Sequence, residues 1–125
     1  IAEITARTND EGWSTVFESW LNTSKLNSKD LIFIFSVGGG NIEKNISVNL
    51  INAINYAKKI NCDVAGIVGR DGGYLANKTD LCLIIPTQSE DTVTPHAEEW
   101  QAVIWHLIVT DPRILSQSNK WESLS

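Results

Sequence analysis

Three short apolar runs, each next to a helical pattern, constrain the fold of this chain more than any other feature. The runs are LIFIF at 31–35, DVAGIVG at 63–69 and LCLIIP at 81–86. Continuous runs of β-branched, aromatic and aliphatic residues are typical of strands buried on both faces, as in a parallel sheet. Strands that alternate with helices pair in parallel through right-handed crossovers. The pattern predicts a three-layer α/β sandwich with a parallel, flavodoxin- or Rossmann-like sheet.

Four helical patterns surround these runs. They cover residues 9–24, 49–60, 74–80 and 94–110. We expect Asn9 or Asp10 to cap the first helix, because both side chains can accept hydrogen bonds from the free N–H groups of a first turn. Thr94 is the expected N-cap of the last helix and Pro95 its first residue, where a missing N–H costs nothing. Pro112 is expected to end that helix.

A sheet of three strands is thin, so we expect a first strand and N-terminal helices upstream of residue 1. Residues 1–125 then form a single partial domain, in which residues 113–125 are a C-terminal tail. In doubly wound sheets, ligands bind beyond the carboxyl ends of the strands. The candidate site is therefore expected in the loops that follow the apolar runs.

Charge and cysteine usage exclude several classes of protein. The net charge is −5 and the lysines and arginines are scattered, so we expect no nucleic-acid partner. No apolar stretch approaches the roughly 18 residues that a membrane span needs, so we expect no membrane insertion. Cys62 and Cys82 form no CxxC motif, and two reduced thiols fit a cytoplasmic, reducing compartment.

The sequence SVGGGN at 36–41 joins the first run to a helix. Three successive glycines cost conformational entropy, which indicates that a ligand approaches this backbone closely. The amides of Gly38 and Gly39, together with the N-terminus of the helix, can bind an anion. Further donors and a charge could come from Ser36, Asn41, Lys44 and Ser47. The segment matches neither G-x-G-x-x-G nor a Walker A loop, and a plain glycine-rich connector is the alternative.

The last helix carries a carboxylate and an imidazole on one broad face. Glu98 and His106 are eight residues apart, a net rotation of about 80° on a helix. Such a pair could transfer protons or contribute to a metal site. The alternative for His106 is a structural histidine on an apolar helix. The sequence RDGG at 70–73 also follows a strand, and we interpret it as a tight turn that requires positive φ.

Several motifs in consistent order resemble a known family. They are TARTNDEGW, FSVGGGNIEKNISVNLINAINYAKK, GIVGRDGGYLA, LCLIIPT and TPHAEEWQAVIWHLIV. Over nearly all of residues 3–110, the chain resembles the sugar isomerase (SIS) domain family, in its phosphoheptose isomerase (sedoheptulose-7-phosphate isomerase) branch. The resemblance implies SIS-domain topology, a phosphosugar ligand, and a homo-oligomer, tetramer or dimer, with sites between subunits.

The resemblance also implies substrate contacts. Asn9 and Asp10 match an Asn-Asp pair that touches the substrate in that family. Ser36 matches the first serine of a phosphate-binding loop, and the chain rejoins the family pattern around Ser47. Between them the loop is longer and richer in glycine than in the family, so phosphate contacts are expected to shift from hydroxyls to backbone amides.

A metal site is implied in the same way. Glu98 and His106 match a Gln and a His that bind metal, here possible ligands of Zn²⁺, and take part in proton transfer. Glu98 departs from the family's Gln, although a carboxylate is an acceptable zinc ligand. A family helix with a second serine stretch, a His and a catalytic Glu has no counterpart in these residues.

The activity that the resemblance implies is an intramolecular oxidoreductase reaction, the aldose–ketose isomerisation of sedoheptulose 7-phosphate to D-glycero-D-manno-heptose 7-phosphate through an enediol(ate). This chemistry needs a base, an acid or metal, and a remote phosphate anchor. Residues 36–47 are the expected anchor, and Glu98 and His106 the expected catalytic groups. The alternatives are a non-catalytic phosphosugar-binding SIS module and an inactive fragment.

Overall fold

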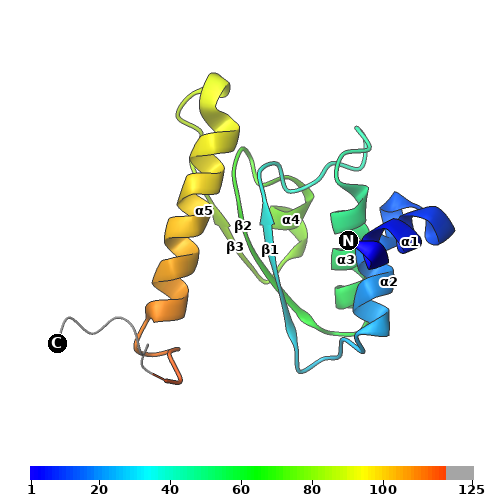
Figure 1. The fold of residues 1–125 in the computed structure, drawn as a ribbon. Helices are drawn as coiled ribbons and strands as arrows, with labels where there is room; N and C mark the ends of the chain where they lie inside the picture. The colour runs from blue at the N-terminus through cyan, green and yellow to red at the C-terminus, as the bar shows by residue number, and fades with distance from the viewer. Residues whose placement is uncertain (118–125) are drawn as a thin grey trace.

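The computed structural model describes residues 1–117 and shows a parallel α/β fold (Figure 1). The strands are β1 (Leu31–Ser36), β2 (Asp63–Val68) and β3 (Leu81–Ile84). The helices are α1 (Ala2–Glu11), α2 (Val16–Thr23), α3 (Val48–Lys59), α4 (Gly73–Lys78) and α5 (Val93–Thr110), with short 3-10 turns η1 (Trp13–Thr15) and η2 (Glu90–Thr92) before α2 and α5. The predicted tail begins within this range, but residues 118–125 lie outside the described residues.

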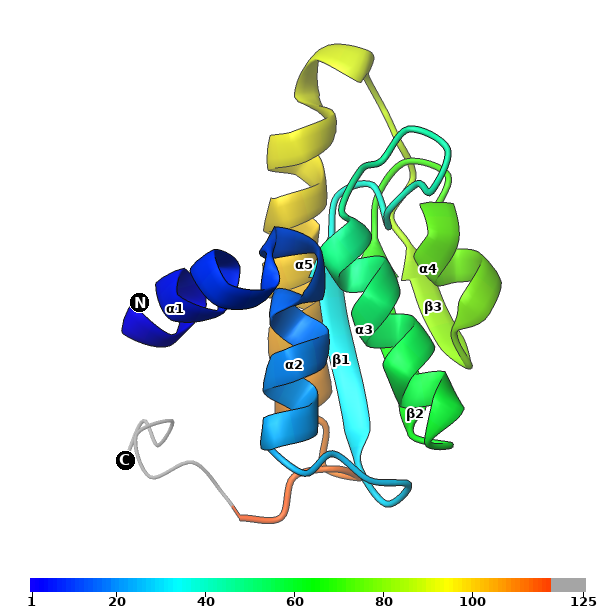
Figure 2. The ribbon, with the colours of Figure 1, turned by 90° about the vertical axis from the view of Figure 1, so that its right-hand side faces the viewer.

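The three strands form one parallel sheet in the order β1-β2-β3. Ser36 pairs with Val68 and Val68 with Ile84, so the carboxyl ends of all three strands meet at one edge. In Figures 1 and 2, α3 and α4 cover one face of the sheet and α5 covers the other, while α2 packs against α3. The predicted three-layer sandwich is confirmed.

The core lies between β2 and the helices α3 and α4. Five of the six residues of β2 are buried, as expected for a central strand. The side chains that pack together include Ile34, Ile54, Val64, Val68 and Leu75. Burial of each such side chain contributes about 1.5–3 kcal/mol to folding, and the cluster holds β1 and β2 against α3 and α4.

The expectation that all three strands are buried on both faces is wrong for β1 and β3. Phe33 and Phe35 of β1 remain 38% and 43% exposed, and most of β3 is exposed. The physical reason is that a single helix, α5, covers that face. Within residues 1–117 the outer edge of β1 has no strand partner, and a mainly apolar groove of about 570 Å³ runs along it.

The predicted helix starts also need correction. Asn9 and Asp10 do not cap a helix but lie in the last turn of α1, which Gly12, at φ 86°, terminates. The N-cap of α5 is Thr92, not Thr94. Pro95 is then the third helical residue, which is tolerated because the first four N–H groups of a helix have no partner inside it.

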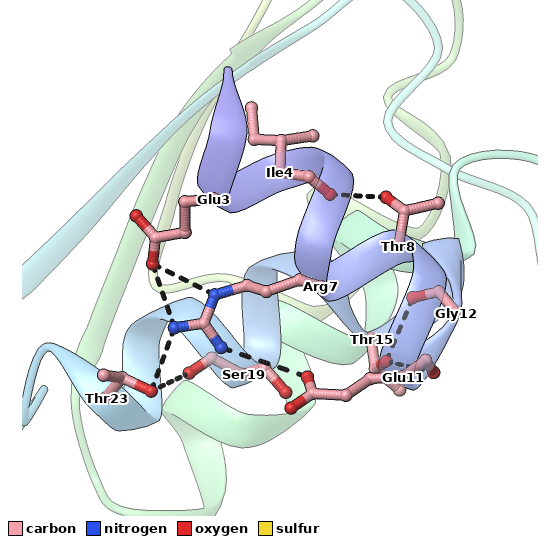
Figure 3. A network of polar contacts seen from close by, with 9 residues as sticks. All are labelled: Glu3, Ile4, Arg7, Thr8, Glu11, Gly12, Thr15, Ser19 and Thr23. Atoms are coloured by element: carbon pink, nitrogen blue, oxygen red, sulfur yellow. Dashed lines mark hydrogen bonds and ion pairs between the residues drawn. The ribbon is translucent and has the colours of Figure 1, made fainter.

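Helix α1 is held by polar contacts, since none of its residues is buried. Figure 2 shows that it extends sideways from α2. The Arg7 guanidinium donates to Glu3 Oε1, at 2.9 and 3.0 Å, and to Thr23 Oγ1 at 3.1 Å, which ties α1 to the end of α2 (Figure 3). Within the described part of the chain, no helix is both long and apolar enough to cross a membrane.

Candidate functional site

An open cavity of about 770 Å³, with a mixed polar and apolar lining, lies at the carboxyl edge of the sheet. This is the edge at which doubly wound sheets bind ligands. Loops after β1, β2 and β3 and the first turn of α5 meet here, at the top of Figure 1. The lining residues are Ser36, Val37, Gly38, Gly40, Asn41, Lys44, Ile46, Ser47, Arg70, Asp71, Gly73, Thr87 and Thr94.

The glycine loop after β1 is pressed against a second glycine turn after β2. A Cβ on Gly39 would overlap the carbonyl oxygen of Gly72 and lie 2.7 Å from its carbonyl carbon. The carbonyls of Gly39 and Gly40 accept the N–H groups of Leu75 (3.0 Å) and Tyr74 (2.9 Å), the first turn of α4. The backbone approach predicted at this triplet is therefore made largely by protein, because the two loops interlock.

Two amides of the loop form no hydrogen bond to the described protein, and of these Gly40 is buried and Gly38 is partly exposed. Gly39 N–H donates to Ser36 Oγ at 3.0 Å, so this amide is already used. Within residues 1–117, the N–H groups of Gly38 and Gly40 donate to no protein acceptor. A Cβ on Gly38 would meet only the flexible Arg70 side chain, at 3.7 Å. Of the three glycines, Gly38 has the most space toward the cavity.

The electrostatics of the cavity favour an anion. Its lining contains two cations, Lys44 and Arg70, and one carboxylate, Asp71, whose Oδ1 accepts the Gly73 N–H at 3.2 Å. Ser47, at φ 52°, precedes the first turn of α3 and also lines the cavity. The N-terminal end of a helix carries partial positive charge and free N–H groups. A phosphate or carboxylate group matches this combination.

The structure brings only part of the predicted binding set together. Ser36, Gly38, Asn41 and Ser47 line the cavity. Asn41 also shapes it, since its Oδ1 accepts the Lys44 N–H at 2.8 Å. Gly39 lies beneath the lining, against Gly72.

Asn9 and Asp10 are not among the residues that line the cavity. Both are exposed on α1, where Asn9 Nδ2 donates to Asp10 Oδ1 at 2.9 Å.

The predicted catalytic and metal residues also lie outside the cavity lining. Glu98 and His106 are both exposed on α5, and the imidazole of His106 stacks on the ring of Trp105 with 5.1 Å between centroids. Residues 1–117 contain no group of three or more His, Cys, Asp or Glu side chains that could hold a metal ion. The described residues therefore do not form a zinc site by themselves.

Two residues of the site were not predicted. Gln101 is buried, and its Nε2 donates to the carbonyls of Ser36 (3.0 Å) and Ile67 (3.1 Å), which fixes α5 to the ends of β1 and β2. The only feature of the sequence that could have indicated Gln101 is that it is a polar residue on the apolar face of the last helix. Arg70 lies in the segment interpreted as a turn, and that turn is confirmed, with φ of 52° at Arg70 and 83° at Gly72.

Comparison with known proteins places these features in context. No protein-family model matches the sequence. The chain is 36% identical over 105 residues to a phosphoheptose isomerase of Sulfurimonas denitrificans. The alignment covers 84% of this chain and 48% of that protein. It is 33% identical over 106 residues to a phosphoheptose isomerase of Aliarcobacter butzleri. That alignment covers 84% of this chain and 50% of that protein.

A solved structure agrees with these sequence matches. The fold matches a phosphoheptose isomerase from Neisseria gonorrhoeae with a TM-score of 0.72 and 26% identity, over 86% of this chain and 55% of that structure. The chain thus spans about half the length of the relatives it matches. Over most of its length, this chain is similar in sequence and in fold to proteins named phosphoheptose isomerases.

Proposed function

We propose that this chain contributes to a phosphoheptose isomerase that converts sedoheptulose 7-phosphate to D-glycero-D-manno-heptose 7-phosphate. The observation that carries the proposal is the cavity at the carboxyl edge of the sheet, which has free glycine amides and two cations, in a homologue of these enzymes. The cavity would hold the phosphate, the end of the substrate that does not react. Binding energy gained there can position the reacting carbons.

The reaction moves a proton between adjacent carbons. A base removes a proton from C1 of the ketose, an enediol(ate) forms, and a proton is delivered to C2 to give the aldose. We assign these transfers to Glu98 and His106. Glu98 lies one turn after Thr94, on the same face of α5, and Thr94 lines the cavity. Along α5, Glu98 is therefore the nearer of the two groups to the cavity, and His106 follows about two turns later.

The remaining partners belong to the same proposal. Asn9 and Asp10 are the proposed sugar contacts, supplied at a site completed between subunits of a homotetramer or dimer. Zn²⁺, if held, would use Glu98 and His106 together with ligands from outside residues 1–117, since the described residues provide no cluster of three. A cytoplasmic location is proposed because Cys62 and Cys82 are both free thiols.

Replacement of His106 by Ala in the full-length protein tests the catalytic assignment. We expect turnover of sedoheptulose 7-phosphate to fall by at least about 100-fold, the scale of a lost general acid or base. His96→Ala is the matched control, because His96 is the other histidine of α5 and has no role in the proposed reaction. Metal content, measured on both variants, shows whether His106 also holds zinc. Wild-type turnover by His106→Ala would overturn the assignment.

A non-catalytic phosphosugar-binding module is the second candidate. The observation that favours it is that Glu98 and His106 are exposed and absent from the cavity lining, whereas the anion-binding features are in place. Calorimetry with sedoheptulose 7-phosphate, paired with an isomerase assay on the same sample, separates the two functions. Binding without turnover would support the module over the enzyme.

A further inference from the structure

Arg70 is a cation whose side chain lies over the glycine loop without an acidic partner. Its Cδ and Nε lie 3.7 and 3.9 Å from the point that a Cβ on Gly38 would occupy. The chain contains three arginines. Arg7 is paired with Glu3 and Arg113 with Asp111, both at 2.9 Å or less, but Arg70 forms no ion pair within residues 1–117. In the part of the chain that the structure describes, the Arg70 guanidinium therefore has no carboxylate partner.

The backbone around Arg70 places this side chain at the cavity. Arg70 follows β2 directly, at φ 52°, a left-handed conformation that L residues adopt only at a cost. The nearby positions with positive φ, 72 and 73, are both glycine. Position 70 thus carries a long cationic side chain where glycine would be less strained. From this position the side chain of Arg70 reaches Gly38 in the loop after β1.

The groups around Arg70 form a complementary set for one kind of ligand. Within residues 1–117 the N–H groups of Gly38 and Gly40 donate to no protein acceptor, and Lys44 and Ser47 belong to the same lining. Asp71, whose Oδ1 accepts the Gly73 N–H, is the carboxylate of this lining, and the two cations and the amides together fit a tetrahedral anion with several acceptor oxygens. A guanidinium can donate two parallel hydrogen bonds to such an anion, which a lysine cannot.

On the basis of the proposed function, we propose that Arg70 is a substrate-binding residue that clamps the phosphate group of the sugar phosphate against the glycine loop. Arg70 thereby sets the preference for phosphorylated over unphosphorylated sugar. Because charge-assisted hydrogen bonds are lost with the guanidinium, its removal is expected to weaken phosphate binding by about 10–100-fold.

The test compares four forms of the full-length protein by calorimetry: wild type, Arg70→Gln, Arg70→Gly and Lys25→Gln. Lys25 is the matched control, since it is also a cation at positive φ, 59°, in a turn outside the cavity. The probes are sedoheptulose 7-phosphate, inorganic phosphate and unphosphorylated sedoheptulose. Arg70→Gly also relieves the backbone strain, so its thermal stability should equal or exceed that of the wild type.

We expect both Arg70 variants to bind the two phosphate probes about 10–100-fold more weakly, with Lys25→Gln unchanged. Equal phosphate affinities of wild type and the Arg70 variants would overturn the role of Arg70 and leave the isomerase proposal standing. Arg70-dependent phosphate binding without turnover of sedoheptulose 7-phosphate would overturn the isomerase and keep Arg70 as an anion-binding residue. A wild type that binds neither phosphate probe would overturn both.

Discussion

At the scale of single residues, the site depends on how closely two glycine turns approach each other. The turn after β1 and the turn after β2 meet backbone to backbone, with Gly39 against Gly72 and Gly73 against the carbonyls of Gly38 and Gly40. This contact leaves no room for a Cβ. It also positions the free amide of Gly38 and the side chain of Arg70 side by side at the cavity.

Gly39→Ala should therefore act on stability before it acts on binding. The new Cβ would overlap the Gly72 carbonyl, and φ at this position is 67°. We expect a loss of roughly 2–5 kcal/mol in the free energy of unfolding, the sum of left-handed strain and overpacking. Urea denaturation of the full-length protein measures it.

Gly38→Ala is the control for that experiment. A Cβ at Gly38 meets only the Arg70 side chain, at 3.7 Å, and Gly38 has no positive φ. Its unfolding free energy should change by less than about 1 kcal/mol. Equal unfolding free energies for the two variants would refute the interlocked arrangement of the turns.

At the scale of elements, the ion pair between Lys58 and Asp80 joins three segments of the fold. Lys58 of α3 contacts both carboxylate oxygens of Asp80 at 2.7 Å, and Asp80 Oδ2 also accepts the N–H of Val64 in β2 at 3.1 Å. Asp80 lies between α4 and β3. The Lys58 contact, followed by the Val64 hydrogen bond, lowers the pKa of the Asp80 carboxyl. The pair is exposed, so it acts as a positioning contact rather than a large source of stability.

This lowered pKa predicts how Asp80→Asn depends on pH. A carboxyl whose pKa is lower in the folded state stabilises the fold above its unfolded pKa, about 3.9, and loses that contribution as pH falls through the folded value. The variant should therefore have a lower Tm than wild type at pH 7, and the difference should shrink below about pH 4.

Thermal unfolding of the wild type, Asp80→Asn and the control variant Asp63→Asn at pH 7 and pH 3 checks this expectation. Asp63 is an exposed carboxylate on β2 that forms no ion pair within residues 1–117. A Tm difference for Asp80→Asn that is the same at pH 7 and pH 3 would contradict the assignment of the pair.

At the scale of the whole molecule, α5 is apolar on both sides. Ala97 and Gln101 are buried toward the sheet. Trp100, Val103 and Leu107 form a stripe at helical spacing that is 47%, 56% and 67% exposed. An exposed apolar stripe on a helix commonly marks a surface that another chain covers. This exposure supports the proposed homo-oligomer, in which a second copy would cover the stripe.

Leu107→Glu is expected to lower the oligomeric state of the full-length protein, because an unpaired carboxylate would be buried in the interface. Light scattering after size-exclusion chromatography measures the mass. Lys29→Glu adds the same side chain at an exposed turn away from α5 and should leave the mass unchanged. An unchanged mass for Leu107→Glu would exclude this stripe from the interface.

Much of the fold could be predicted because its signals are local. The apolar runs at 31–35, 63–69 and 81–86 predicted all three strands, and helical spacing predicted α3 and α5 within one or two residues. Helix starts were less predictable. Whether Asn9 caps a helix or ends one depends on the residues before it and on Gly12, and both choices satisfy the same local hydrogen-bonding rules.

The sequence by itself determined the parallel sheet and the edge of the sheet at which the cavity lies, because hydrophobic periodicity and the order of strands and helices are written along the chain. Only the tertiary structure decided what approaches the glycine triplet, since Gly39 and Gly72 are distant in sequence and meet through the pairing of β1 with β2. The same pairing brought Arg70 over Gly38, whereas the packing of α5 against the sheet left Glu98 and His106 outside the cavity lining. Contacts between distant segments follow from packing, which local patterns do not encode.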